Sequence, residues 1–195
     1  MQEIAYGADQ GTTVFVEDLF DTTPVRKKYL KSTTTERYHL RSFLLNYLIM
    51  HRDKAWSVRH QGRSVRQLSL ASSLVERIVD LTQAAWQPHL HPFEAQHESV
   101  ALHGVVGDAS LHFPSTEQMR FFVNSRPVED KIMKKALLEV MRRQMPAGLY
   151  PFAYLFLEID PSLVDVNVHP RKLEVKFLDP GKVFGILTKL LHAQT

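Results

Sequence analysis

Two neighbouring cations, Arg171 and Lys172, stand where the sequence predicts a loop between two strands. Residues 164–168 and 173–177 each alternate apolar and polar side chains, with the period of two that a half-buried strand has. Pro170 separates the two segments and ends their pairing, because it lacks a backbone N–H. Cations on a loop between rigid strands can contact an anionic ligand. The alternation alone, however, favours an ordinary surface hairpin with solvated cations.

Further basic residues gather in three other segments. A predicted helix at residues 25–31 carries Arg26, Lys27, Lys28 and Lys31. Arg126 lies in a predicted turn. A predicted helix over 130–145 carries Lys131, Lys134, Lys135, Arg142 and Arg143. Such a surface would bind nucleic-acid phosphates through counterion release and without sequence preference. The alternative is a solvated helix surface, and the charge pattern leaves both interpretations open.

The remaining polar residues complete no catalytic site. The chain contains no cysteine, which excludes disulfides, thiolate nucleophiles and cysteine-ligated zinc. His89 and His91 are the closest pair among ten histidines, but no further ligand follows at a usable spacing, so we expect no metal site. The phosphate-binding motif G-x-x-x-x-G-K-[ST] and the sequence context of a nucleophilic serine are both absent.

The composition is that of a folded protein with a weak preference for anionic partners. Of 195 residues, 44% are hydrophobic and 23% are charged, and Lys plus Arg outnumber Asp plus Glu by 24 to 21. This length allows one large domain or two small ones. No segment has the roughly 18 apolar residues of a membrane span, and the N-terminal residues lack the features of a signal peptide.

Strand and helix patterns alternate along the whole chain. The predicted strands cover residues 11–20, 56–60, 64–68, 99–106, 119–123 and 152–159. The predicted helices cover 25–31, 33–50, 73–81, 130–145 and a closing segment after Asp179 and Pro180. This interleaving predicts an α/β fold, an α+β sandwich in which helices pack on a mixed sheet.

Two details of this pattern bear on the packing. The helix over 33–50 has an apolar stripe that we expect in the core, formed by Leu40, Phe43, Leu44, Tyr47 and Leu48. Residues 87–92 contain two prolines and predict a loop or an internal boundary.

Three motifs, in this order, closely resemble those of the MutL mismatch-repair family. Residues 11–30 contain Gly-Thr-Thr-Val, then Asp-Leu-Phe, then Thr-Pro-Val-Arg-Lys-Lys-Tyr-Leu. Residues 122–128 read Phe-Val-Asn-Ser-Arg-Pro-Val, where the family has Val-Asn-Gly-Arg. Residues 165–175 match the family pattern Asp-Val-Asn-Val-His-Pro-x-Lys-x-Glu-Val nearly letter for letter. The matches span most of the chain and together are highly specific.

The resemblance implies a domain assignment and three site residues. Residues 21–195 would form the transducer domain, whose fold is similar to domain 2 of ribosomal protein S five. Residues 1–20 would be the end of the preceding Bergerat-type (GHKL) ATPase domain with a junction strand. Lys172 matches the family lysine that reaches the γ-phosphate of ATP, and Thr12 lies in the Gly-Thr motif beside the nucleotide. Arg126 falls where the family has a DNA-contacting arginine.

The resemblance also implies function and partners. The full-length protein would bind ATP and Mg²⁺ and couple ATP hydrolysis to homodimer closure, DNA binding, and recruitment of the mismatch-recognition protein MutS and a downstream nuclease or helicase. It would act in the cytoplasm or nucleoid of a bacterium, or in the nucleus of a eukaryote. The family's catalytic Glu, Mg-binding Asn and Asp-x-Gly-x-Gly segment have no counterpart here, so the chain by itself is predicted to be inactive.

The chain departs from the family pattern near the domain junction without changing the assignment, and two alternatives stay open beside it. Asp21 and Thr22 replace the more usual Tyr-Asn, and Val25 replaces Ala. A stand-alone basic α/β module that binds nucleic acid would share the basic surface. The transducer domain of a type II topoisomerase would also have a switch lysine that plays a part similar to that of Lys172. The Asn-Val-His-Pro motif, however, favours the MutL family.

Overall fold

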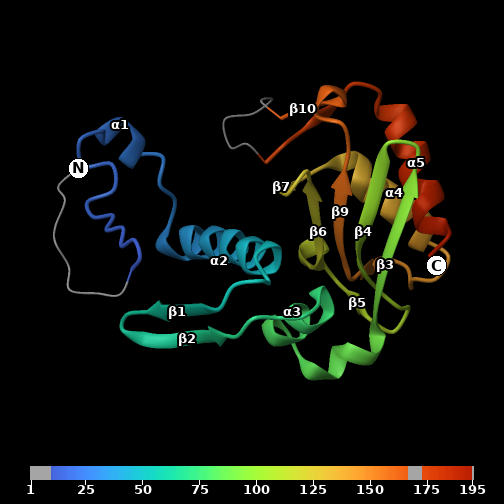
Figure 1. Cartoon of the computed structure of the whole chain (residues 1–195). Coiled ribbons are helices and arrows are strands. Elements are labelled where there is room, and N and C mark those ends of the chain that lie inside the picture. Colours follow the sequence, from blue (N-terminus) through green and yellow to red (C-terminus); the bar gives the residue numbers. More distant parts are fainter. Residues whose placement is uncertain (1–9, 167–172, 195) are drawn as a thin grey trace. The chain divides into compact units, whose positions relative to one another are not determined.

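The protein contains two compact units, Met1–Ser42 and Phe43–Thr195. The structure is a computed structural model that describes residues 10–166 and 173–194 (Figure 1). The boundary falls inside helix α2 (Thr33–Met50), which has the bounds that the sequence predicts. This division differs from the predicted boundary between residues 20 and 21, and the assignment of an ATPase remnant and a transducer domain stays a prediction.

The first unit has no buried residue between positions 10 and 42. The predicted strand over 11–20 is wrong, because residues 11–17 lie outside any helix or strand. The side chains of Val14, Phe15 and Val16 are 76%, 69% and 73% exposed. An extended segment is not stable as a strand without a partner, and residues 10–42 supply none. Helix α1 (Pro24–Lys27) begins at the predicted proline but is shorter than predicted.

The second unit is built on a mixed sheet, as predicted, and this sheet has five strands. In spatial order its strands are β3 (Leu90–His97), β4 (Val100–Gly107), β9 (Ala153–Glu158), β6 (Met119–Val123) and β7 (Arg126–Val128). Strands β6 and β9 run parallel, and every other neighbouring pair is antiparallel.

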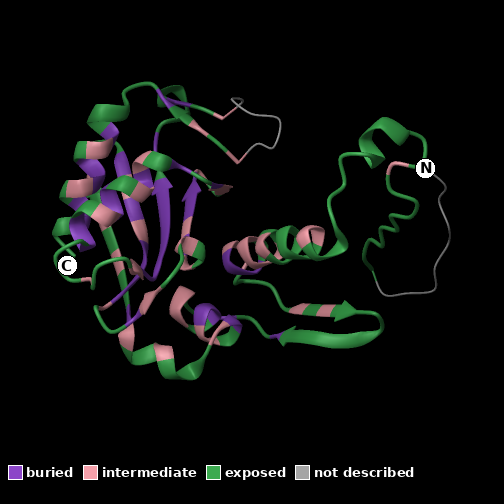
Figure 2. Ribbon diagram, turned by 180° about the vertical axis from the view of Figure 1, so that it is seen from behind, coloured by how far each residue is buried: buried purple, intermediate pink, exposed green. Residues whose placement is uncertain are grey.

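Helices cover both faces of this sheet, so its central strands are buried on both sides (Figure 2). On one face, Leu155 and Leu157 of β9 pack with α4 (Lys131–Met141) and α5 (Pro180–His192). On the other face, the intervening Tyr154 and Phe156 join a cluster with the end of α2 and with α3 (Leu74–Leu81). Strands buried on both faces have nearly continuous apolar sequences, as residues 152–157 do.

The predicted hairpin is confirmed. Strands β1 (Trp56–His60) and β2 (Arg63–Leu68) pair antiparallel. Gln61 and Gly62 form the turn, with φ angles of 50° and 74°. Two consecutive left-handed residues give the turn type that matches the twist of paired strands.

One prediction about packing is wrong, and a second holds only in part. Residues 87–92 form no boundary: they close the 3₁₀ helix η1 (Ala84–His89) and open β3. Pro92 is tolerated there because β3 is an edge strand. The apolar stripe of α2 is only partly in the core, since Leu48 is 1% exposed but Leu40 and Phe43 are 66% and 53% exposed.

Short elements complete the second unit. They are β5 (His112–Phe113), η2 (Thr116–Gln118), β8 (Tyr150–Pro151), η3 (Pro161–Leu163), β10 (Val164–Asp165) and β11 (Lys176–Phe177). In residues 10–166 and 173–194, no helix is both long and apolar enough to cross a membrane.

Candidate functional site

The two strands that lead into and out of the predicted phosphate-binding loop are anchored in the core. Strands β10 and β11 pair antiparallel with Val164 opposite Phe177, and both side chains are buried. The Leu178 N–H donates to the Leu163 carbonyl at 2.9 Å and extends this pairing. The predicted strands are therefore present but short. Arg171 and Lys172 lie outside the described residues, so the role of Lys172 stays a prediction.

The turn that carries Arg126 is fixed to the segment that precedes this loop. Asn124 and Ser125 have left-handed φ angles of 47° and 60° and connect β6 with β7. The Asn124 side chain accepts from the Ile159 N–H and donates to the Ile159 carbonyl, both at 2.9 Å. Asparagine adopts the left-handed conformation more readily than most residues. Ser125 holds it where the family motif has Gly, which adopts it without strain.

Arg126 lies beside the segment that enters the loop. Its Nη1 donates to the Val166 carbonyl at 3.4 Å, just before the loop. The Glu129 N–H donates to the Leu173 carbonyl at 2.6 Å, just after the loop. The predicted DNA-contacting residue, Arg126, thus lies next to the start of the loop predicted to contact the nucleotide. Its side chain is half-buried there.

The other predicted site residues belong to the unit Met1–Ser42. Thr12 is exposed, and so is the basic cluster at α1, Arg26, Lys27, Lys28 and Lys31. Lys27 forms an ion pair of 3.6 Å with Asp21, and both side chains are largely exposed. An exposed pair of this kind contributes little to stability, which leaves these cations available for a ligand.

The basic side chains of α4 are mostly exposed, and one of them also packs against α5. Lys135 Nζ lies 5.0 Å from the centre of the Phe184 ring, in a cation–π contact that helps α4 pack on α5. Arg142 and Arg143, which we predicted to be helical, follow the last residue of α4 and are exposed.

The histidine pair singled out in the sequence meets one carboxylate. His89 Nδ1 lies 2.9 Å from Asp108 Oδ2, and His91 Nε2 lies 3.7 Å from the same oxygen. The hydrogen bond with His89 lowers the pKa of Asp108 more than partial burial raises it. Within the part of the chain that the structure describes, no group of three or more His, Asp or Glu side chains could hold a metal ion.

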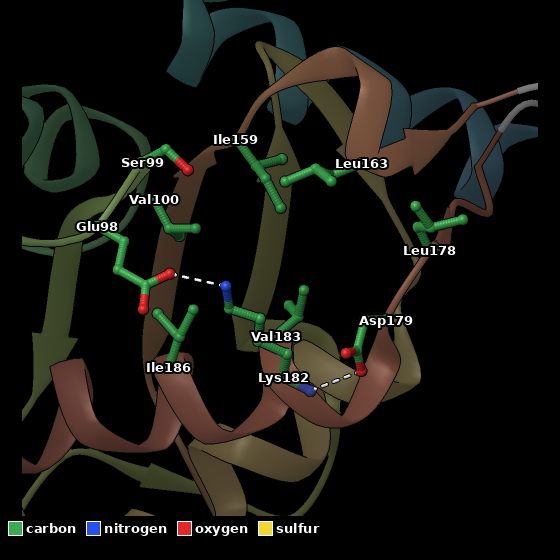
Figure 3. Close-up of a pocket in the computed structure, with 10 residues that line it drawn as sticks. All are labelled: Glu98, Ser99, Val100, Ile159, Leu163, Leu178, Asp179, Lys182, Val183 and Ile186. Carbon is green, nitrogen blue, oxygen red and sulfur yellow. Dashed lines mark hydrogen bonds and ion pairs between the residues drawn. The ribbon is translucent and has the colours of Figure 1, made fainter.

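A small apolar pocket lies between α5 and the ends of β4 and β9 (Figure 3). Its volume is about 90 Å³, far below the roughly 300 Å³ of a typical small-molecule site. Val100, Ile159 and Ile186 line it, and the 2.8 Å ion pair of Lys182 with Glu98 borders it. A nucleotide would not fit.

Four arginines are absent from the residues that the sequence predicted to be functional. Arg59, Arg63 and Arg66 are exposed on the β1–β2 hairpin, and Arg77 of α3 is fully buried. The absence of acidic residues from positions 56–68 could have marked the hairpin. Nothing local marks Arg77, since an arginine in an amphipathic helix normally faces water.

Residues 78–195 match the family model for the C-terminal domain of DNA mismatch repair protein. The chain is 36% identical over 185 residues to the DNA mismatch repair protein MutL of Pseudomonas fluorescens, covering 93% of this chain and 29% of that protein. It is 35% identical over 171 residues to MutL of Opitutus terrae, covering 88% and 27%. The chain thus spans less than a third of the length of these relatives.

Solved structures show the same fold. The N-terminal domain of a DNA repair protein superposes with a TM-score of 0.71 and 22% identity, over 89% of this chain and 58% of that one. The ATPase domain of Aquifex aeolicus MutL, solved with ADP, superposes with a TM-score of 0.54 and 25% identity, over 74% and 51%.

Proposed function

Because the chain belongs to the MutL family of DNA mismatch repair proteins, we propose that it is the transducer region of such a protein. In this proposal it couples ATP binding and hydrolysis in a preceding ATPase domain to homodimer closure, DNA binding and recruitment of MutS and of a downstream nuclease or helicase. The observation that supports it is the contact of Arg126 with Val166 at the base of the loop that carries Lys172.

In this proposal the chain contributes residues to an ATP site but does not form the complete site. Lys172 would contact the γ-phosphate, where a compact ammonium can neutralise charge on the transferred phosphoryl group. Thr12 would lie beside the nucleotide. No carboxylate cluster for Mg²⁺ is found in residues 10–166 and 173–194, so the Mg²⁺ ligands would come from elsewhere in the full-length protein.

The hydrogen bond from Arg126 to Val166 suggests how the two activities would be coupled. Arg126 uses one nitrogen to hold the segment that enters the loop, and its other donors can face a DNA phosphate. A phosphate that draws the guanidinium away would release this segment, and a shift of Val166 when ATP binds would in turn reorient Arg126. Such a reciprocal effect is what a coupling free energy between two sites requires.

The test is the ATPase rate of the full-length protein. We expect Lys172→Ala to lower it about 100-fold, the usual cost of removing one electrostatic contact to the transition state, with the fold intact. Lys176→Ala is the matched control, because Lys176 is an exposed lysine on β11, four residues further along. An unchanged rate in Lys172→Ala would remove this lysine from the site. The chain by itself should hydrolyse no ATP, and stoichiometric hydrolysis by clean material would contradict that.

DNA binding is tested separately. We expect Arg126→Glu to weaken binding to duplex DNA, most strongly at low salt, because a phosphate contact is electrostatic. Affinity that responds neither to salt nor to this charge reversal would mean that Arg126 makes no DNA contact.

A further inference from the structure

The β1–β2 hairpin is a strongly basic surface element apart from the residues proposed above. Residues 56–68 contain Arg59, His60, Arg63 and Arg66 and no Asp or Glu, although acidic and basic residues are nearly balanced in the whole chain. All four side chains are exposed. In Figure 1 the hairpin extends away from the five-stranded sheet of its own unit.

The cations are concentrated around the turn. His60 pairs with Arg63, and Arg59 pairs with Ser64 in the next rung, so both arginines lie within one residue of the two-residue turn. Directly paired residues share one face of a hairpin and successive residues alternate between faces, so Arg59 and Arg63 project from opposite faces near its tip. Neither Arg59 nor Arg63 forms an ion pair within residues 10–166 and 173–194. Within the described residues, both guanidinium groups are therefore left without a carboxylate partner and can meet an anionic ligand.

Buried contacts hold the base of the hairpin. Arg77 is fully buried, and its Nη2 lies 2.9 Å from the Lys54 carbonyl and 2.8 Å from the Ser69 carbonyl, one on each side of the hairpin. On the exposed side chain of Arg66, Nη2 donates to the Leu81 carbonyl of α3 at 3.3 Å. A hairpin fixed at its base presents its arginines with little further loss of conformational entropy on binding.

We infer that the hairpin binds the phosphate backbone of duplex DNA through Arg59 and Arg63. The planar guanidinium forms paired hydrogen bonds with phosphate oxygens, and a surface without carboxylates does not repel the phosphates. Backbone contacts of this kind add affinity without sequence preference, as a repair protein that acts at any sequence needs. The choice of DNA as the polyanion rests on the proposed function.

The test compares duplex DNA binding by the full-length protein and by the double variant Arg59→Gln/Arg63→Gln from about 50 to about 200 mM salt. We expect about tenfold weaker binding near the low end of this range. The slope of log affinity against log salt should become shallower by about 1.8, or about 0.9 for each phosphate that the variant no longer neutralises. The control variant Arg37→Gln/Arg41→Gln removes the same charge from two exposed arginines of α2 and should keep the slope of the unmodified protein.

Three other outcomes would overturn the inference. One is an unchanged affinity of the hairpin variant, and a second is weaker binding with an unchanged salt slope, which would indicate an indirect effect on folding. The third is an equal decrease in affinity in the control variant. Arg126→Glu, measured in parallel, separates this inference from the proposed function. If only Arg126→Glu weakens binding, the hairpin inference fails and the proposed function stands; if neither change weakens it, the proposed DNA role fails as well.

Discussion

Replacing Arg77 by Met tests whether a buried cation holds the hairpin to α3. The Arg77 Nη2 has two hydrogens and lies 2.8–3.0 Å from three carbonyls, those of Arg52, Lys54 and Ser69. Met has a similar volume and no donors, so the substitution removes all three interactions without opening a large cavity. The Arg52 carbonyl still accepts from the Ala71 N–H at 2.9 Å, which leaves two carbonyls without these donors.

The expected destabilisation follows from those two carbonyls. Each acceptor left without a partner costs about 1–3 kcal/mol, about 4 kcal/mol for both. The variant also removes Arg77 Nε and Nη1, which are buried without a hydrogen-bond partner, and this recovers about 1 kcal/mol for each nitrogen. The net destabilisation should therefore be about 2 kcal/mol.

Urea unfolding of the 195-residue chain measures this difference, and hydrogen exchange locates it. Amides of β1 and β2 should lose protection more than those of β4 and β9, because regions of a protein open separately when their local contacts weaken. The exposed Arg142 offers a control, since Arg142→Met should change the unfolding free energy by less than about 0.5 kcal/mol. An Arg77→Met variant as stable as the unmodified chain would show that desolvation of the cation outweighs its hydrogen bonds, and the reasoning would be wrong.

Two further predictions concern packing and pH. Gly104→Ala should destabilise the chain by about 3 kcal/mol in urea unfolding, because a Cβ there would overlap the Tyr154 carbonyl of the neighbouring strand. Gly185→Ala, in α5 with open space around it, should instead stabilise by about 0.5–1 kcal/mol, and equal effects at both sites would contradict this account. The hydrogen bond with His89 lowers the pKa of Asp108, so its contribution to stability is present above the ordinary value of 3.8 and is lost as pH falls through the lowered one. The Asp108→Asn variant should therefore lose less unfolding free energy than the unmodified chain as the pH falls. Acid titrations at a fixed urea concentration would measure this. Unfolding curves that coincide for the two proteins at acid pH would contradict the prediction.

Elements specified by their own residues could be predicted from the sequence. The hairpin turn follows from Gln61-Gly62, because glycine readily adopts the left-handed conformation that this turn needs. The start of α4 follows from Asp130, whose carboxylate accepts from the N–H groups of Ile132 and Met133 at 2.9 and 2.7 Å. Burial raises the pKa of Asp130, and these hydrogen bonds partly oppose that rise.

Features that depend on residues distant in the sequence could not be predicted. The period of α2 identifies an apolar face, but nothing in it says that Leu48 would be covered and Leu40 would not. Pro92 suggests a loop until the sheet order makes β3 an edge strand. Within the candidate site, the turn at Asn124 and the two strands beside the loop could be predicted from the local sequence pattern. The contact of Arg126 with Val166 joins residues 40 positions apart and needed the fold.

The exposed segment Gly11–Val16 also affects how the protein can be handled. It contains two threonines, two valines and a phenylalanine in succession and no charge, and Val14, Phe15 and Val16 are largely exposed. Exposed, uncharged β-branched and aromatic residues favour cross-β stacking between identical chains. Aggregation of the 195-residue chain should therefore begin at this segment, and a lysine in place of Phe15 should slow it.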